Sequence, residues 1–211
     1  MVCFDLEGTL VDPGPGAMDA ATYALSRLGV SESSPYRLRR LIGPPLEEAF
    51  ALYYHLKPLD AEKAADHYYQ RYLEYGMDDN SLYDGIPRLL KRLRQSRTGM
   101  VALSCRDPIY VSRIMRKFDL AGMFITARGH TMGAGGSKSH VLEELLISLP
   151  VLEGKRMVMV GDREDDIIAA RENDIPCLAV GYGFGSAEEL RNASPEAICG
   201  SVRELTDALI S

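Results

Sequence analysis

The chain has 211 residues, enough for one sizeable domain or for a core domain that carries a smaller insert. Hydrophobic residues make up 46% of it and charged residues 26%, which is typical of a globular protein in water. The formal net charge of −6 and the lack of a long basic run argue against nucleic acid or an anionic membrane surface as a partner.

The sequence also indicates in which cellular compartment the protein is expected. No stretch approaches the roughly 20 apolar residues that span a bilayer, and the start MVCFDLEG lacks the basic and apolar segments of a signal peptide. The four cysteines are scattered and form no CxxC pair. These features predict a cytoplasmic protein whose cysteines stay reduced.

The first elements in chain order are one strand and then helices only. The apolar run MVCF, ending at Asp5, predicts a buried strand. Pro-Gly-Pro-Gly at 13–16 predicts a break, followed by a helix that ends at Gly29. From there to about residue 79 the patterns are helical, and the Gly-Pro-Pro at 43–45 predicts the start of a new helix at PLEEAF.

Beyond residue 80, helical and strand patterns alternate. Helices are expected over 82–99, 107–122, 137–149, 164–175, 186–193 and 201–211, and strands over 100–104, 123–129, 156–162, 176–180 and 196–200. Such alternation predicts an α/β fold, a doubly wound parallel sheet covered on both faces. Residues 1–12 and 80–211 are predicted to form this core, and residues 13–79 an inserted all-helical domain.

Polar side chains gather where the predicted strands end. Asp5 and Glu7 follow the first strand, Ser104 ends another, and Asp162 ends a third, with Asp166 four residues later. In doubly wound sheets these strand ends meet at one edge. So many carboxylates repel one another unless a cation neutralises them, and ligands that are all oxygen favour Mg²⁺.

Lys138 opens the helix that follows the strand over 123–129, so it is expected at the same edge. A metal ion together with this lysine supplies the positive charge that a phosphate group needs in an otherwise acidic protein. The pattern therefore predicts a site for a phosphorylated small molecule.

Four motifs in order carry a resemblance to a known family. They are FDLEGTLVD at 4–12, ALS at 102–104, GGSKSHVLEELL at 135–146 and VMVGDREDDIIAARENDIP at 158–176. Together they resemble the haloacid dehalogenase superfamily, and within it the phosphatases similar to phosphoglycolate phosphatase, which have a helical cap after the first motif. LIGPPLEEAF and VGYGFGSAEEL resemble the branch that includes 5′-nucleotidase-like members.

The resemblance implies roles for these residues. Asp5 would be the nucleophile that becomes an aspartyl phosphate, and Glu7 the general acid/base, whose backbone carbonyl would also bind the metal. Ser104 would hydrogen-bond a phosphoryl oxygen, and Lys138 would hold both Asp5 and the phosphate. Among the metal residues, Asp162 would ligate Mg²⁺ beside Asp5 and Glu7, while Asp166 would orient the ligands around the ion.

Glu7 departs from the pattern, because most phosphatases of this kind have aspartate there. The enolase-phosphatase branch resembles this sequence in having glutamate. The extra methylene could misplace the acid by about 1 Å, which costs roughly 10²-fold in rate. The sequence does not explain why the longer acid is present.

The implied activity is Mg²⁺-dependent hydrolysis of a small phosphorylated metabolite, with phosphoglycolate or a nucleoside 5′-monophosphate as first candidates. The alternatives are a phosphomutase, a haloacid dehalogenase, which needs no metal and lacks a carboxylate two residues after the nucleophile, or a phosphate-binding protein impaired by Glu7. A phosphonatase would need a lysine of the cap, and only Lys57 and Lys63 are available. No nucleic acid polymer and no membrane is expected as a partner, and the protein is expected to be a monomer or a homodimer.

Two features next to the predicted site residues in the sequence are expected to have structural roles only. Asp165, beside Asp166, is interpreted as a solvated acid in the first turn of a helix. The glycine-rich GHTMGAGG at 129–136 lacks the G-K-[ST] of a P-loop and is interpreted as a connection.

Overall fold

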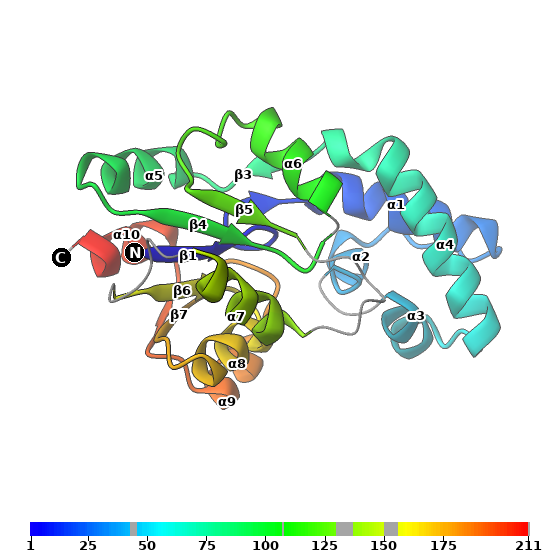
Figure 1. Cartoon of the computed structure of the whole chain (residues 1–211). Helices are drawn as coiled ribbons and strands as arrows, with labels where there is room; N and C mark the ends of the chain where they lie inside the picture. The colour runs from blue at the N-terminus through cyan, green and yellow to red at the C-terminus, as the bar shows by residue number, and fades with distance from the viewer. Residues whose placement is uncertain (43–45, 107, 130–136, 150–155, 211) are drawn as a thin grey trace. The chain divides into compact units, whose positions relative to one another are not determined.

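The structure is a computed structural model that describes residues 1–42, 46–106, 108–129, 137–149 and 156–210 (Figure 1). The chain forms two compact units. The core unit combines Met1–Val11 with Leu82–Ser211, and the helical unit is Asp12–Ser81. The predicted Gly-Pro-Pro interruption at 43–45 lies outside the described residues.

The core unit is built on a six-stranded sheet with the order β5-β4-β1-β6-β7-β8, and its neighbouring strands pair in parallel. The strands are β1 (Val2–Asp5), β4 (Met100–Leu103), β5 (Thr126–Arg128), β6 (Val158–Gly161), β7 (Cys177–Val180) and β8 (Ala197–Cys199). The strand order reverses direction at β1, as in doubly wound folds. The predicted parallel α/β core is confirmed.

Helices cover both faces of this sheet. They are α5 (Ile86–Gln95), α6 (Pro108–Lys117), α7 (Lys138–Ser148), α8 (Glu164–Glu172), α9 (Ala187–Ala193) and α10 (Val202–Ile210). In Figure 1, α5 and α6 lie above β4 and β5, while α7, α8 and α9, which pack on one another in that order, form a layer that extends to the bottom of the view. The lower layer packs on buried strand residues such as Cys3, Val101 and Met159, which form one hydrophobic cluster with Leu142 and Ile167. This packing fixes the strands whose ends carry the site residues.

The helical unit contains α1 (Gly14–Arg27), α2 (Pro35–Arg39), α3 (Leu46–Tyr54), α4 (Pro58–Glu74) and the 3₁₀ turn η1 (Gly76–Asp78). The break predicted over 13–16 is wrong, because α1 begins at Gly14, inside that sequence. Proline is tolerated in the first turn of a helix, and Asp12 Oδ1 accepts a hydrogen bond from the Gly14 N–H at 2.8 Å. Gly16 is required there for another reason, since a Cβ would collide with the carbonyl of Gly76.

Each boundary between the two units in the sequence falls inside a short strand, β2 (Val11–Asp12) or β3 (Ser81–Leu82), and these two strands pair with each other. The helix predicted over 82–99 therefore begins only at Ile86, after Gly85 with φ of 92° at its N-cap. The role of the helical unit as a cap stays a prediction. No helix in the described part of the chain is long and apolar enough to cross a membrane.

Candidate active site

Three neighbouring strands of the core unit bring the predicted residues to one edge of the sheet. β1 lies between β4 and β6, with Asp5 paired to Leu103 and Phe4 paired to Val160. Ser104 follows β4 directly, and Asp162 follows β6 directly. Because the strands are parallel, their carboxyl ends meet at this edge, where ligands bind in doubly wound folds.

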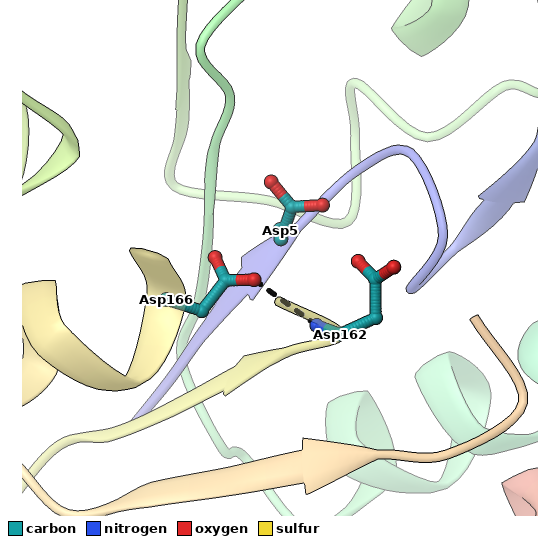
Figure 2. A group of neighbouring side chains, drawn as sticks. All are labelled: Asp5, Asp162 and Asp166. Carbon is teal, nitrogen blue, oxygen red and sulfur yellow. Dashed lines mark hydrogen bonds between the residues drawn. The ribbon is translucent and has the colours of Figure 1, made fainter. Parts of the chain in front are cut away.

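Three carboxylates converge there (Figure 2). Asp5, Asp162 and Asp166 each offer an oxygen atom within 4.8 Å of the others, and all three side chains are buried. We call these residues the acidic cluster. Asp166 comes from the first turn of α8, where it accepts hydrogen bonds from the backbone N–H groups of Asp162 and Arg163, both at 3.0 Å. Asp166 therefore fixes the turn that carries Asp162.

Lys138 supplies the positive charge at the acidic cluster. It is the first residue of α7, whose N-cap Ser137 accepts a hydrogen bond from the His140 N–H. The ammonium Nζ lies 2.5 Å from Asp5 Oδ1 and also pairs with Asp166 Oδ1, and the lysine side chain is only 8% exposed. Burial alone would lower the pKa of Lys138, but the Asp166 and Asp5 charges outweigh it and raise that pKa well above the usual value.

The acids of the cluster respond to burial and to one another. Burial raises the pKa of Asp5 well above its usual value, the charges of Asp166 and Asp162 add to the rise, and Lys138 opposes it. Burial and the Asp166 charge likewise raise the pKa of Asp162 to about 7. Without a cation beyond Lys138, Asp5 and Asp162 therefore hold protons more tightly than ordinary carboxyl groups do.

Asp162 is held from two sides by backbone and side-chain donors. Its Oδ2 accepts a hydrogen bond from the Phe184 N–H at 2.8 Å, and its Oδ1 accepts one from the Thr9 hydroxyl at 3.3 Å. Gly8 and Gly183 come so close to this side chain that a Cβ on either would collide with it. Gly8 has φ of 86°, so it also needs the left-handed conformation open to glycine.

Ser104 is buried at the end of β4. Its Oγ accepts a hydrogen bond from the Arg106 backbone N–H at 3.2 Å. A serine hydroxyl has one donor hydrogen and two acceptor lone pairs. Since this bond uses one lone pair only, the hydroxyl hydrogen can donate to a ligand oxygen.

Glu7 does not join the acidic cluster through its side chain. Its Oε2 accepts a hydrogen bond from Arg106 Nε, and its Oε1 accepts one from the Tyr110 hydroxyl at 2.5 Å. The Glu7 side chain is 11% exposed, and the Arg106 side chain is 31% exposed. The two acids of FDLEGTL thus occupy different environments, Asp5 against Lys138 and Glu7 against Arg106.

The acidic cluster fits a divalent metal ion. Three carboxylates with one lysine carry a net negative charge, and hard oxygen ligands are those that ions such as Mg²⁺ and Ca²⁺ prefer. A bound cation would also offset the burial and the mutual repulsion that together raise the pKa values of Asp5 and Asp162. The donor set therefore suits a hard divalent cation.

The structure thus gathers three of the predicted acids around Lys138, which contacts Asp5 and Asp166, while Asp162 has an oxygen within 4.8 Å of theirs. The Glu7 side chain instead binds Arg106 and Tyr110. Asp165 is exposed, as its interpretation as a solvated acid required. Residues 130–136 of the glycine-rich GHTMGAGG lie outside the described residues.

Sequence reasoning missed Thr9, Arg106, Tyr110 and the Phe184 N–H. Thr9 could have been found, because it stands in the quoted FDLEGTL beside the acids. Phe184 acts through its backbone, and Arg106 and Tyr110 belong to no recognised motif.

Comparisons with known proteins identify the family to which the chain belongs. Residues 2–180 match the model of the haloacid dehalogenase-like hydrolase family. A 5′-nucleotidase of Pseudomonas aeruginosa is 35% identical over 100% of this chain and 95% of its own length. The tyrosine-protein kinase PtkA of Mycobacterium tuberculosis is 32% identical over 99% of this chain and 72% of its own length.

Among solved structures, a predicted phosphatase from Clostridium acetobutylicum is similar with a TM-score of 0.85 and 34% identity, over 99% of this chain and 97% of that one. The fold, the four motifs and these matches agree over nearly the whole sequence, so the resemblance stated from the motifs is confirmed. The chain is an enzyme that belongs to the haloacid dehalogenase-like hydrolase family.

Proposed function

We propose that the protein is a Mg²⁺-dependent phosphatase that hydrolyses a small phosphate monoester through an aspartyl-phosphate intermediate. The observation that carries this proposal is the buried contact of Lys138 with Asp5 and Asp166 beside Asp162. A carboxylate nucleophile next to a fixed cation, with further acids for a metal, is suited to attack on an anionic phosphate.

In the first step, an Asp5 carboxylate oxygen attacks phosphorus and the bond from phosphorus to the ester oxygen breaks. Lys138 balances charge on the transferring phosphoryl group, and the Ser104 hydroxyl donates to one of its oxygens. Glu7 gives a proton to the departing ester oxygen, so the products are an alcohol and phosphorylated Asp5.

In the second step, water attacks the phosphorus of phosphorylated Asp5. Glu7, now a carboxylate, removes a proton from that water, and the bond between Asp5 and phosphorus breaks. Inorganic phosphate leaves and Asp5 returns to its carboxylate form. Both proton transfers thus use one carboxylate, which each cycle restores.

Mg²⁺ would be held by Asp5, Asp162 and the backbone carbonyl of Glu7, with Asp166 orienting the ligands around it. When bound, the ion supplies positive charge that polarises the phosphoryl oxygens and offsets the acidic cluster. The hydrogen bonds from Phe184 and Thr9 would keep the Asp162 oxygens directed for this purpose.

A nucleoside 5′-monophosphate is the first substrate class to test, because the nucleotidase of Pseudomonas aeruginosa covers all of this chain at 35% identity. Phosphoglycolate comes second, as the motifs imply. In related enzymes with a helical cap, the cap selects the substrate, and the helical unit is expected to do so here.

The experiment measures hydrolysis of an aryl phosphate and of nucleoside monophosphates with Mg²⁺ and with a chelator. We expect turnover that needs the metal and that falls by at least about 10³-fold in Asp5→Asn. Asp165→Asn is the matched control, since this acid is exposed beside Asp166, and its activity should equal that of the wild type. Equal activity of Asp5→Asn and wild type would contradict the proposal.

The similarity to PtkA gives that experiment a second arm. The same preparations are incubated with a nucleoside triphosphate labelled in its terminal phosphate, and tyrosine phosphorylation is measured. If the protein is a phosphatase, we expect no Asp5-dependent transfer of the labelled phosphate to tyrosine. Labelled tyrosine without ester hydrolysis would favour a kinase instead.

A further inference from the structure

The carboxylate of Glu7 is fixed by two donors from the chain segment that follows β4. Arg106 Nε donates to Oε2, and the Tyr110 hydroxyl donates to Oε1 at 2.5 Å. Each carboxylate oxygen therefore has its own donor, and rotation of the carboxylate would break both hydrogen bonds. Tyr110 is 4% exposed and lies in α6, so its hydroxyl is held by the packing of that helix.

Arg106 is tied to the site at its backbone as well. Its N–H donates to the hydroxyl oxygen of Ser104 at 3.2 Å, while its side chain pairs with Glu7. One residue thus links the proposed phosphate-binding hydroxyl to the proposed acid/base. Because the contact with Ser104 is made by the backbone, a substitution of the Arg106 side chain removes the contact with Glu7 and leaves the Ser104 hydrogen bond possible.

The length of the side chain at position 7 matches this arrangement. An aspartate would end one methylene earlier, so that its oxygens would stop about 1 Å short of both donors, and a misplacement of that size can cost about 10²-fold in rate. Glutamate in place of aspartate at position 7 looks unfavourable in the sequence. In the structure, however, its longer side chain is the one that reaches both donors.

We propose that Arg106 and Tyr110 are the positioning residues of Glu7, and that the glutamate at position 7 is matched to them. The inference rests on the proposed phosphatase function. Arg106 and Tyr110 each hold one oxygen of Glu7 and so fix the orientation of its carboxyl group, which gives a proton to the departing ester oxygen and then takes one from the attacking water.

Two substrates separate this role from a general structural one. The p-nitrophenolate group leaves a phosphate without needing a proton, whereas an alkoxide leaves only when a general acid protonates it. The value of kcat/KM reports the first step alone. A fault in the position of Glu7 should therefore lower kcat/KM for an alkyl phosphate and spare p-nitrophenyl phosphate.

We expect Arg106→Gln to lower kcat/KM for the alkyl ester about 10²-fold and Tyr110→Phe about 10-fold, with changes under about 3-fold for the aryl ester. Glu7→Asp should show the same split. In a Glu7→Gln background, Arg106→Gln should have almost no further effect, because the group that it positions is already gone. Arg116→Gln, an exposed arginine of α6, is the matched control and should behave as wild type.

Three outcomes would overturn the proposal. If Arg106→Gln lowered kcat/KM equally for both esters, Arg106 would act on phosphate binding or on folding and not on Glu7. Full additivity with Glu7→Gln would show that Arg106 acts independently of Glu7. A Glu7→Asp enzyme that matches wild type on the alkyl ester would show that the glutamate is not matched to its donors.

The proposed function can fail separately. If the wild type with Mg²⁺ hydrolyses neither ester, the phosphatase proposal fails and the positioning role fails with it. If the wild type hydrolyses both esters in an Asp5-dependent way and the variants show no split, only the positioning role is overturned.

Discussion

Lys138 is the residue on which the charge balance of the site depends. Its ammonium group pairs with Asp5 and Asp166, and all three side chains are almost completely buried. Without the ammonium group, the carboxylates of Asp5 and Asp166 would lose the cation that pairs with both of them and would still face each other and Asp162 in buried surroundings. Lys138 is therefore expected to affect both stability and turnover.

Lys138→Met tests this expectation. At neutral pH and without metal, we expect the free energy of unfolding to fall by roughly 3 kcal/mol, because removal of one partner leaves buried charges uncompensated. Turnover should fall at least about 10²-fold. Urea unfolding and kcat measure the two effects. Lys91→Met, on the exposed side of α5, controls for the substitution itself, and similar values for both variants would contradict the role of Lys138.

At the residue scale, the sequence predicted the position of strand-end side chains well. Asp5, Ser104 and Asp162 follow directly from the rule that parallel strands end at one edge. Arg106 and Tyr110 could not be predicted, because their contact with Glu7 joins residues about 100 positions apart. Such a contact depends on how α6 packs, and no local pattern encodes that packing.

At the scale of elements, the loop that follows β7 holds Asp162 in place. The Phe184 N–H donates to Asp162, and Gly183 lies against both the Asp162 side chain and the Gly8 carbonyl. A Cβ at position 183 would stand 2.6 Å from Asp162 Oδ2 and closer still to the Asp162 Cβ. Asp162 can therefore occupy its position only because residue 183 has no side chain.

Gly183→Ala should therefore move Asp162. We expect the Mg²⁺ concentration for half-maximal activity to rise about 10-fold or more, and stability to fall by about 1–3 kcal/mol, as in overpacked sites. Activity titrated with Mg²⁺ and thermal unfolding give these values. Gly181→Ala is the matched control, because a Cβ there meets its first neighbour only at 3.7 Å. An unchanged Mg²⁺ requirement in Gly183→Ala would refute the argument.

The order of strands and helices in the core could be read from hydrophobic periodicity, but some element boundaries could not. The sequence Pro-Gly-Pro-Gly reads locally as a break, whereas α1 begins within it. A tertiary contact accounts for a glycine inside this helix, because Gly16 allows the close approach of the Gly76 carbonyl, sixty residues later in the chain. Close backbone contacts of this kind leave no signal in the surrounding sequence.

At the scale of the whole molecule, the buried acids link stability to pH. Burial and Asp166 raise the pKa of Asp162 to about 7, and burial with its acidic neighbours raises that of Asp5. In the unfolded chain such carboxyls titrate near pH 4. Between these values the folded protein binds more protons than the unfolded chain, so its stability decreases as the pH rises through this range.

The metal-free protein should accordingly lose stability, on the order of a few kcal/mol, between about pH 5 and about pH 8, and Mg²⁺ should restore more of it at the higher pH. Urea unfolding with chelator and with Mg²⁺ at both pH values measures this. Asp162→Asn has no proton to lose at that position, so it should show a weaker dependence on pH in chelator and a smaller gain from Mg²⁺. The stability of the metal-free wild type could instead stay level or increase over this pH range, and that of Asp162→Asn could change in the same way. This result would show that the acidic cluster does not control the pH dependence of stability.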